Sequence, residues 1–347
     1  MPRLSGIYTI NFTRHKAGID KTAYVSSYKL VSLNGYNDLT FGYVCILDNA
    51  EFCINIKTGN MKLIAVEEHF LTKAVKTEWQ KFPDKDDPTH KLHFGEIESH
   101  LEDIGNSRLR LMDETGIDVQ VLSLTSPSLH NLESESINLA IQTNDYVAEI
   151  VRKTPDRFQG FAALPMFAPK EATKELERSV KDLGLKGAML CGRTREKNLD
   201  HKDFWELFAC AEALSVPLFI HPQIPQKAVR DVYYSGFDEL TDLAFSTFGL
   251  GWHYEAGIQF VRLVLAKVFD RFPNLQIILG HWGEVILFYT ERLASLNRAT
   301  KLDRSFMDYV QQNLYVTASG MFSHSYLQRS VEIIGADRIL FSADYPY

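Results

Sequence analysis

The chain has 347 residues, a net charge of −7 and 45% hydrophobic residues, a composition typical of a globular protein that can bury a large core. The negative charge is spread without long blocks, which argues against general affinity for nucleic acid, and no run of about 18 apolar residues predicts a membrane span. The four cysteines show no CxxC spacing and the N-terminus lacks a secretory apolar core, so a reducing, cytoplasmic setting is the simplest interpretation.

The predicted elements begin at Met61. Residues 1–60 show no sustained apolar period, so we predict an N-terminal extension over 1–60 and a domain over 61–347. Apolar, β-branched runs predict strands buried on both faces at 62–70, 119–124, 158–166, 187–192, 216–222, 275–281, 314–319 and 339–346. Helical spacing of apolar residues predicts helices between them at 97–116, 137–153, 170–184, 202–215, 261–272, 284–296, 305–312 and 324–335.

Eight strands that alternate with helices predict an α/β fold, a (β/α)8 TIM barrel, with an open doubly wound sheet as the alternative. The barrel is favoured because polar residues gather at the C-terminal ends of the strands, where a barrel keeps its active site. Two longer connections, 72–95 and 223–254, are expected to lie over that face as lids or subunit contacts.

Imidazole and carboxylate side chains mark several of these strand ends. Glu67 and His69 end the first strand, His221 the fifth, His281 the sixth and Asp344 the eighth. Residues i and i+2 of a strand point the same way, so Glu67 and His69 both face the barrel mouth. Each side chain alone is more often structural, but together they predict a site for one divalent metal. Nitrogen and oxygen ligands without thiolate suit Zn²⁺, and also Mn²⁺ or Fe²⁺.

The stretch GHWGE adds Glu284 three residues after His281, near the start of a predicted helix where a carboxylate suits the helix dipole. Contact between the two would fix the tautomer of His281 and make it a general acid/base. The alternative is a helix N-terminal glutamate without that contact. Arg292 could bind a substrate carboxylate bidentately or form a surface ion pair, and the sequence leaves both open. Cofactor-binding glycine motifs are absent, which argues against a nicotinamide oxidoreductase.

From Met61 onward the chain resembles the amidohydrolase-2 family, the group of aminocarboxymuconate semialdehyde decarboxylase and the aromatic-acid decarboxylases. The likeness is greatest to 2,3-dihydroxybenzoate (o-pyrocatechuate) and γ-resorcylate decarboxylases. The resemblance rests on AVEEHF, DRFQGFAALPM, GLKGAMLCG, WELFACAEALSVPLFIHP, GWHYEAGIQFVRLVLAKVFDRFPNLQIILGHWGE and ILFSADYPY. The order E-x-H, HP, GHxGE and SxDYP is specific, although each motif alone is weak.

The resemblance also implies roles for individual residues. The implied metal ligands are Glu67, His69, His221 and Asp344, holding one Zn²⁺ most simply, with Mn²⁺ as the alternative and no organic cofactor. The implied catalytic groups are His281, Glu284 and Asp344. Arg292 and Asn297 match positions that contact the substrate, and Phe82 matches an aromatic wall over its ring.

The activity implied is non-oxidative decarboxylation of a (di)hydroxybenzoate-type aromatic acid, with release of CO₂ and a proton from Asp344 or His281. The expected partner is a small aromatic carboxylic acid, with no nucleic acid and no membrane, in a homodimer or homotetramer. The alternatives are a metal-dependent hydrolase of a lactone or amide in the same superfamily, or an inactive truncated homologue.

The chain departs from the family pattern at both ends. Residues 1–60 have no counterpart in the family, so we expect a mis-assigned start or a translated upstream region, with a genuine extra module as the alternative. The sequence stops three residues after Asp344, where the family continues with helices that close the barrel. Those C-terminal helices are therefore expected to be truncated.

Overall fold

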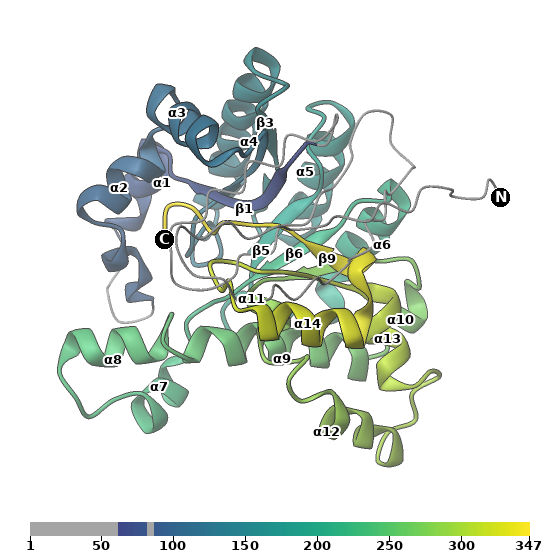
Figure 1. Cartoon of the computed structure of the whole chain (residues 1–347). Coiled ribbons are helices and arrows are strands. Elements are labelled where there is room, and N and C mark those ends of the chain that lie inside the picture. The colour runs from purple at the N-terminus through teal and green to yellow at the C-terminus, as the bar shows by residue number, and fades with distance from the viewer. Residues whose placement is uncertain (1–61, 82–86) are drawn as a thin grey trace, which may run out of the picture.

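The computed structural model describes residues 62–81 and 87–347 (Figure 1). The predicted extension over 1–60 and Phe82 lie outside the described residues. The described strands are β1 Ile64–Phe70, β2 Val119–Leu124, β3 Phe158–Gly160, β4 Ala162–Ala163, β5 Ala188–Cys191, β6 Leu218–His221, β7 Ile277–Leu279, β8 Leu314–Thr317 and β9 Ile339–Leu340.

The α-helices of the described residues lie between and after these strands, with four short 3₁₀ segments among them. They are α1 Lys73–Trp79, α2 Gly95–Glu102, α3 Asn106–Thr115, α4 Glu135–Lys153, α5 Pro169–Lys181, α6 Trp205–Leu214, α7 Lys227–Tyr233, α8 Glu239–Ser246, α9 Gly251–Leu265, α10 Val268–Arg271, α11 His281–Glu284, α12 Thr290–Ala294, α13 Phe306–Asn313 and α14 His324–Ile334. None of them is long and apolar enough to cross a membrane.

The strands form a parallel barrel. Their pairing runs β1-β2-β3 in one arc and from β4 to β9 in the other. β3 and β4 continue each other across Phe161, whose amide donates to the Leu122 carbonyl oxygen at 2.8 Å. At the other junction, the Val66 amide donates to the Phe341 carbonyl oxygen at 3.0 Å, which joins β1 to the chain that follows β9. The predicted eight-stranded (β/α)8 barrel is therefore confirmed, and the open sheet is not formed.

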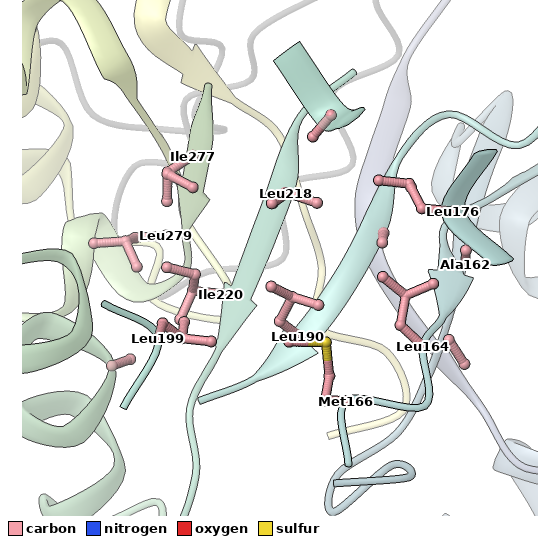
Figure 2. Close-up of a cluster of buried hydrophobic side chains, with 14 of the residues drawn as sticks. Ala162, Leu164, Met166, Leu176, Leu190, Leu199, Leu218, Ile220, Ile277 and Leu279 are labelled. Atoms are coloured by element: carbon pink, nitrogen blue, oxygen red, sulfur yellow. The ribbon is translucent and has the colours of Figure 1, made fainter. Parts of the chain in front are cut away.

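Two apolar layers hold the barrel together, one inside the strands and one between the strands and the helices. The inner cluster comprises Ile64, Val66, Val119, Val121, Phe161, Met189, Phe219, Ile278 and Leu340. Figure 2 shows part of the larger outer cluster, including Ala162, Leu190, Leu218, Ile220, Ile277 and Leu279. Strands covered on both faces explain why these segments are apolar throughout rather than alternating.

The predicted helix over 97–116 divides into α2 and α3. The chain turns at Asp103. Its Oδ1 accepts a hydrogen bond from the Gly105 amide at 2.7 Å, and its backbone oxygen accepts one from Nε of Arg108 at 3.0 Å. An aspartate that binds nearby backbone and side-chain donors in this way favours a turn over a continuous helix.

The predicted helix over 284–296 is largely wrong. Every residue from His281 to Val285 has a positive φ, between 45° and 84°, so the chain turns sharply as it leaves β7. Turns continue to Tyr289, and beyond them only α12 and a short 3₁₀ segment at Ser295–Arg298 are helical within the predicted range. Glu284 therefore does not begin a helix, and the dipole argument for its position fails.

Both long connections border the site, as expected. The first contains α1 and a 3₁₀ segment at Pro88–Leu92, and the second contains α7 and α8, which extend outward from the barrel (Figure 1). Residues from 92–97 and from 240–253 line the cavity at the C-terminal ends of the strands.

Candidate active site

A bulge in β1 directs Glu67 and His69 into the barrel mouth. Ile64 and Val66 belong to the inner cluster, so strict alternation along β1 would turn Glu67 outward. The pairing with β2 shifts between Ala65 and Glu68, so that an extra residue is accommodated. Beyond this bulge the inward and outward positions of the strand are exchanged, so Glu67 and His69 point inward. Bulges are often used in this way to redirect side chains beside functional sites.

The outward residue of this segment is Glu68. Its carboxylate accepts hydrogen bonds from Nε2 of Gln120 at 2.9 Å and from the amide of Ala343 at 2.8 Å. Burial raises the pKa of Glu68 to about 8. Glu68 thus belongs to the packing behind the barrel wall.

His221, at the end of β6, faces the same point as Glu67. Its Nδ1 lies 2.8 Å from the Pro222 carbonyl oxygen, which can only accept, so Nδ1 carries the proton and Nε2 keeps a lone pair. Nε2 lies 4.0 Å from Oε1 of Glu67, and the ring packs edge-on against His69 at 5.0 Å between centroids. Burial lowers the pKa of His221 to about 3, which keeps it neutral, as a metal ligand must be.

Asp344 reaches the site from the turn after β9, with φ of 62°. Its Oδ1 lies 3.1 Å from Nε2 of His69, and its Oδ2 lies 3.6 Å from Nε2 of His281. Although burial alone would raise it, the pKa of Asp344 is lowered by hydrogen bonds from His281 and His69. Asp344 therefore joins the predicted ligand cluster to the predicted acid/base.

The two oxygens of Glu67 have different surroundings. Oε2 accepts hydrogen bonds from Oγ1 of Thr317, at 3.2 Å, and from Oγ of Ser319. Oε1 is buried and has no hydrogen-bond partner. Burial and the negative charge of Asp344 raise the pKa of Glu67 to about 7. An unpaired buried carboxylate oxygen is costly, and a cation there would offset that cost.

The donor set fits a divalent metal. Glu67, His69 and His221 each offer a ligand atom, and these atoms lie within 4.8 Å of one another, with Asp344 against His69. Carboxylate and neutral imidazole ligands suit Zn²⁺ or Mn²⁺.

Sequence reasoning missed Thr317 and Ser319, the hydroxyl partners of Glu67. The signal was present in VTAS, where two hydroxyls two residues apart at a strand end must share a face.

His281 and Glu284 form the predicted pair. Nδ1 of His281 lies 2.7 Å from Oε1 of Glu284, a side chain that is fully buried. Although burial alone would raise it, the charge of His281 and hydrogen bonds from His253 and His281 lower the pKa of Glu284 to about 2. Burial opposes protonation of His281, but Glu284 and Asp344 raise its pKa well above the usual value. The arrangement can hold a proton at Nε2 of His281, facing Asp344.

A cavity of about 1010 Å³ opens over these groups. His221, His281 and Asp344 lie in its wall among mostly apolar and aromatic side chains, including Trp252 and Tyr347. A largely apolar wall with a few convergent polar groups suits a small ligand with an aromatic ring.

Arg292 and Asn297, the predicted substrate contacts, do not join the cavity of this chain. Arg292 is exposed on α12, and its guanidinium makes no ion pair with another described residue. Asn297 is also exposed, and its Oδ1 accepts a hydrogen bond from the Phe306 amide at 2.9 Å. Neither residue lines the cavity, so their predicted roles stay predictions.

The barrel and the groups at its C-terminal mouth define a TIM barrel of the metal-dependent hydrolase type. The amidohydrolase family matches residues 100–347, well over half of the chain. The chain therefore belongs to the amidohydrolase family.

Similar proteins include aromatic-acid decarboxylases. The γ-resorcylate decarboxylase of Polaromonas sp. (strain JS666) is 38% identical over 299 residues, which cover 82% of this chain and 88% of that protein. The crystal structure of dihydroxybenzoic acid decarboxylase from Polaromonas sp. JS666, with bound manganese and the inhibitor 2-nitroresorcinol, matches with a TM-score of 0.72 and 35% identity, covering 82% of this chain and 86% of that chain. The 5-carboxyvanillate decarboxylase of Novosphingobium aromaticivorans DSM 12444, complexed with manganese, matches with a TM-score of 0.79 and 27% identity, covering 86% and 90%.

Proposed function

We propose that this chain is a metal-dependent, non-oxidative decarboxylase of a (di)hydroxybenzoate-type aromatic acid, a carboxy-lyase that releases CO₂. The observation that carries the proposal is the unpaired, buried Oε1 of Glu67, which faces Nε2 of His221 beside the His281–Glu284 pair. The similar decarboxylases, two of them with manganese in their structures, support the same reaction class.

Glu67, His69, His221 and Asp344 would hold one divalent metal. When bound, such an ion acts as a Lewis acid that lowers the pKa of a ring hydroxyl and orients the carboxylate beside it. The structures of similar enzymes favour Mn²⁺, whereas the donor atoms suit Zn²⁺ equally well. The hydroxyls of Thr317 and Ser319 would orient Glu67 toward the ion.

His281 and Asp344 would supply the proton. Glu284 holds Nδ1 of His281, so Nε2 faces the cavity and Oδ2 of Asp344 at 3.6 Å. The proton passes from this pair to the ring carbon that carries the carboxylate, which interrupts the aromatic system. The carbon–carbon bond then breaks, CO₂ leaves, and the electron pair of that bond restores the aromatic ring.

We further propose that the enzyme is a homodimer or homotetramer. Large apolar side chains are exposed on and beside α7 and α8, with Val232 and Tyr233 each 72% exposed and Leu240 68% exposed. Large apolar side chains left exposed close together in the sequence are typical of subunit contacts. The molar mass in solution by light scattering, for the native chain and for Leu240→Asp, tests this proposal, and an unchanged monomer in both would contradict it.

Arg292 is a predicted substrate contact that does not line the cavity of its own chain. Because Arg292 is exposed on α12, outside the cavity of its own chain, we propose that it acts on the cavity of a neighbouring subunit. Mixed oligomers of Arg292→Ala and His281→Ala subunits should recover CO₂ release that neither variant shows alone. Failure of the mixture to recover activity would place Arg292 outside catalysis or within its own site.

We also propose a cytoplasmic location. Both described cysteines, Cys191 and Cys210, are free thiols, which suits a reducing compartment. Detection of the protein in a fraction other than the cytoplasm would contradict this.

The decisive experiment uses the full chain, purified without added chelator. We would measure bound metal per chain and CO₂ release from 2,3- and 2,6-dihydroxybenzoate, for the native chain and for His281→Ala. His201→Ala is the matched control, because His201 lies on the exposed surface. One metal per chain, with CO₂ release lost only in His281→Ala, is expected. Bound metal without CO₂ release from any hydroxybenzoate would overturn the decarboxylase.

A further inference from the structure

His253 lies against the side of Glu284 that His281 does not use. In the sequence it lies within the connection 223–254, away from the strand ends that mark the predicted site. The structure instead puts Nδ1 of His253 2.8 Å from Oε2 of Glu284, while Nδ1 of His281 lies 2.7 Å from Oε1. One buried carboxylate therefore sits between two imidazoles, whose ring centroids are 4.6 Å apart at an interplanar angle of 65°.

The ring of His253 is held at both ends. Its Nε2 lies 3.2 Å from the carbonyl oxygen of Phe248, at the turn that precedes α9. Both oxygens are acceptors, so a neutral ring, which carries one N–H, donates to one of them, and only the doubly protonated ring donates to both. The side chain is only 19% exposed, so water replaces neither contact easily.

The approach of α9 to Glu284 depends on Gly257. A Cβ at this position would lie 2.3 Å from the backbone oxygen of Glu284, closer than any side chain permits. The helix can therefore lie directly on the backbone of the turn after β7, which brings His253, one turn earlier on α9, within hydrogen-bonding distance of the carboxylate.

These three side chains could also be taken for a second metal site, since one ligand atom from each lies within 4.8 Å of the others. Their contacts do not favour that interpretation. Each imidazole nitrogen lies at a hydrogen-bond distance from a different oxygen of Glu284, so the carboxylate is satisfied by two N–H donors. The unpaired oxygen that marks the Glu67 cluster has no equivalent at Glu284.

We propose that His253 is a positioning residue, which donates from Nδ1 to Oε2 of Glu284 and thereby keeps Oε1 aimed at Nδ1 of His281. A carboxylate held on one side only can rotate about its last torsion, which is broad. Held on both sides, it keeps His281 in the tautomer with the proton on Nδ1 and Nε2 directed at the cavity. This role rests on the proposed decarboxylase function, in which His281 and Asp344 supply the proton.

Two substitutions separate the donor from the bulk of the side chain. His253→Asn places an amide N–H near the position of Nδ1 and can still donate to Glu284. His253→Gln extends toward the position of Nε2, where it can contact the Phe248 carbonyl but leaves Oε2 of Glu284 without its donor. Thermal unfolding and bound metal per chain, measured on both variants, identify any loss that comes from folding.

The first measurement is the kcat and KM of CO₂ release for the two variants. We expect kcat to fall about 10- to 100-fold in His253→Gln, the usual range for an outer-shell partner, with KM little changed, and to stay within about 3-fold of the native value in His253→Asn. Equal kcat in the two variants, whether both native-like or both impaired, would overturn the proposal.

The second measurement is independent of activity. Nitrogen-15 spectra of histidine side chains, recorded at one pH high enough that the His281 ring is neutral, report the tautomer of His281 in the full chain. The proton is expected on Nδ1 of His281 in the native protein and in His253→Asn, and shared between both nitrogens in His253→Gln. An unchanged tautomer in His253→Gln would overturn the positioning role. If the native chain releases no CO₂ from any acid, the decarboxylase proposal fails, while this spectrum still decides the role of His253.

Discussion

The substitution Ser319→Ala tests the arrangement around Glu67 most directly. Oγ of Ser319 donates to Oε2 of Glu67, and Oγ1 of Thr317 donates to the same oxygen at 3.2 Å. These bonds leave Oε1 as the oxygen that faces His221. Without the serine hydroxyl, one of the two donors that hold this orientation is lost.

Two physical effects of Ser319→Ala act in the same direction. The carboxylate of Glu67 gains rotational freedom, so its Oε1 is less well placed for a cation. The pKa of Glu67, which burial and Asp344 raise to about 7, also loses a hydrogen bond that lowers it, so protons compete better for the ligand. Loss of one outer-shell partner typically reduces metal affinity about 10- to 100-fold. That range corresponds to about 1.4–2.8 kcal/mol of binding free energy.

The assay is calorimetric titration of Mn²⁺ into the chelator-treated full chain, for the native protein and Ser319→Ala. Ser136→Ala is the matched control, because it removes a buried hydroxyl that bonds only the Glu133 backbone oxygen, at 2.6 Å. Ser319→Ala is expected to bind more weakly and Ser136→Ala to bind as the native chain does. Native affinity in Ser319→Ala, or equal losses in both variants, would refute the reasoning.

Three further predictions concern the same barrel. Glu284→Gln should lower kcat for CO₂ release about 100-fold or more while bound metal per chain is retained, because the amide no longer holds His281 in its tautomer; unchanged kcat would remove Glu284 from the mechanism. Gly280→Ala should reduce both metal content and activity, because a Cβ there would lie 3.3 Å from Oε1 of Glu67 and 2.9 Å from Oγ of Ser319; native metal content by atomic absorption would contradict this. His130→Gln should make folding less sensitive to acid. Burial lowers the pKa of His130 from 6.5 to about 3, so between these values the unfolded chain binds a proton that the folded chain does not. The free energy of unfolding of the native chain therefore falls by about 1.4 kcal/mol per pH unit below pH 6.5 on account of this residue, and urea unfolding at pH 6.5 and 5.5 should show a smaller decrease in the variant.

The sequence by itself determined the barrel and the location of its mouth. Apolar runs such as 216–222 and 275–281 are strands because strands buried on both faces must be apolar throughout, and this pattern is local. Glu67, His69, His221, His281 and Asp344 could be named because each directly ends or follows such a run, and a barrel gathers those ends.

Only the tertiary structure decided how these groups face one another. The bulge in β1 arises from pairing with β2, some 55 residues away along the chain, and it reverses which side chains point inward. The hydrogen bond from Ser319 to Glu67 joins residues 252 positions apart in the sequence, and that between His253 and Glu284 joins residues 31 positions apart. No local spacing predicts either contact.

The turn after β7 shows the same limit in the backbone. The stretch from Glu284 onward has the apolar spacing of a helix, yet a run of positive φ angles directs the chain elsewhere. That conformation is stabilised by long-range contacts, among them His253 on the carboxylate of Glu284 and α9 on its backbone at Gly257. Periodicity in a sequence records which residues are buried along one element, whereas register, bulges and the aim of a carboxylate depend on contacts between elements that are distant in the chain.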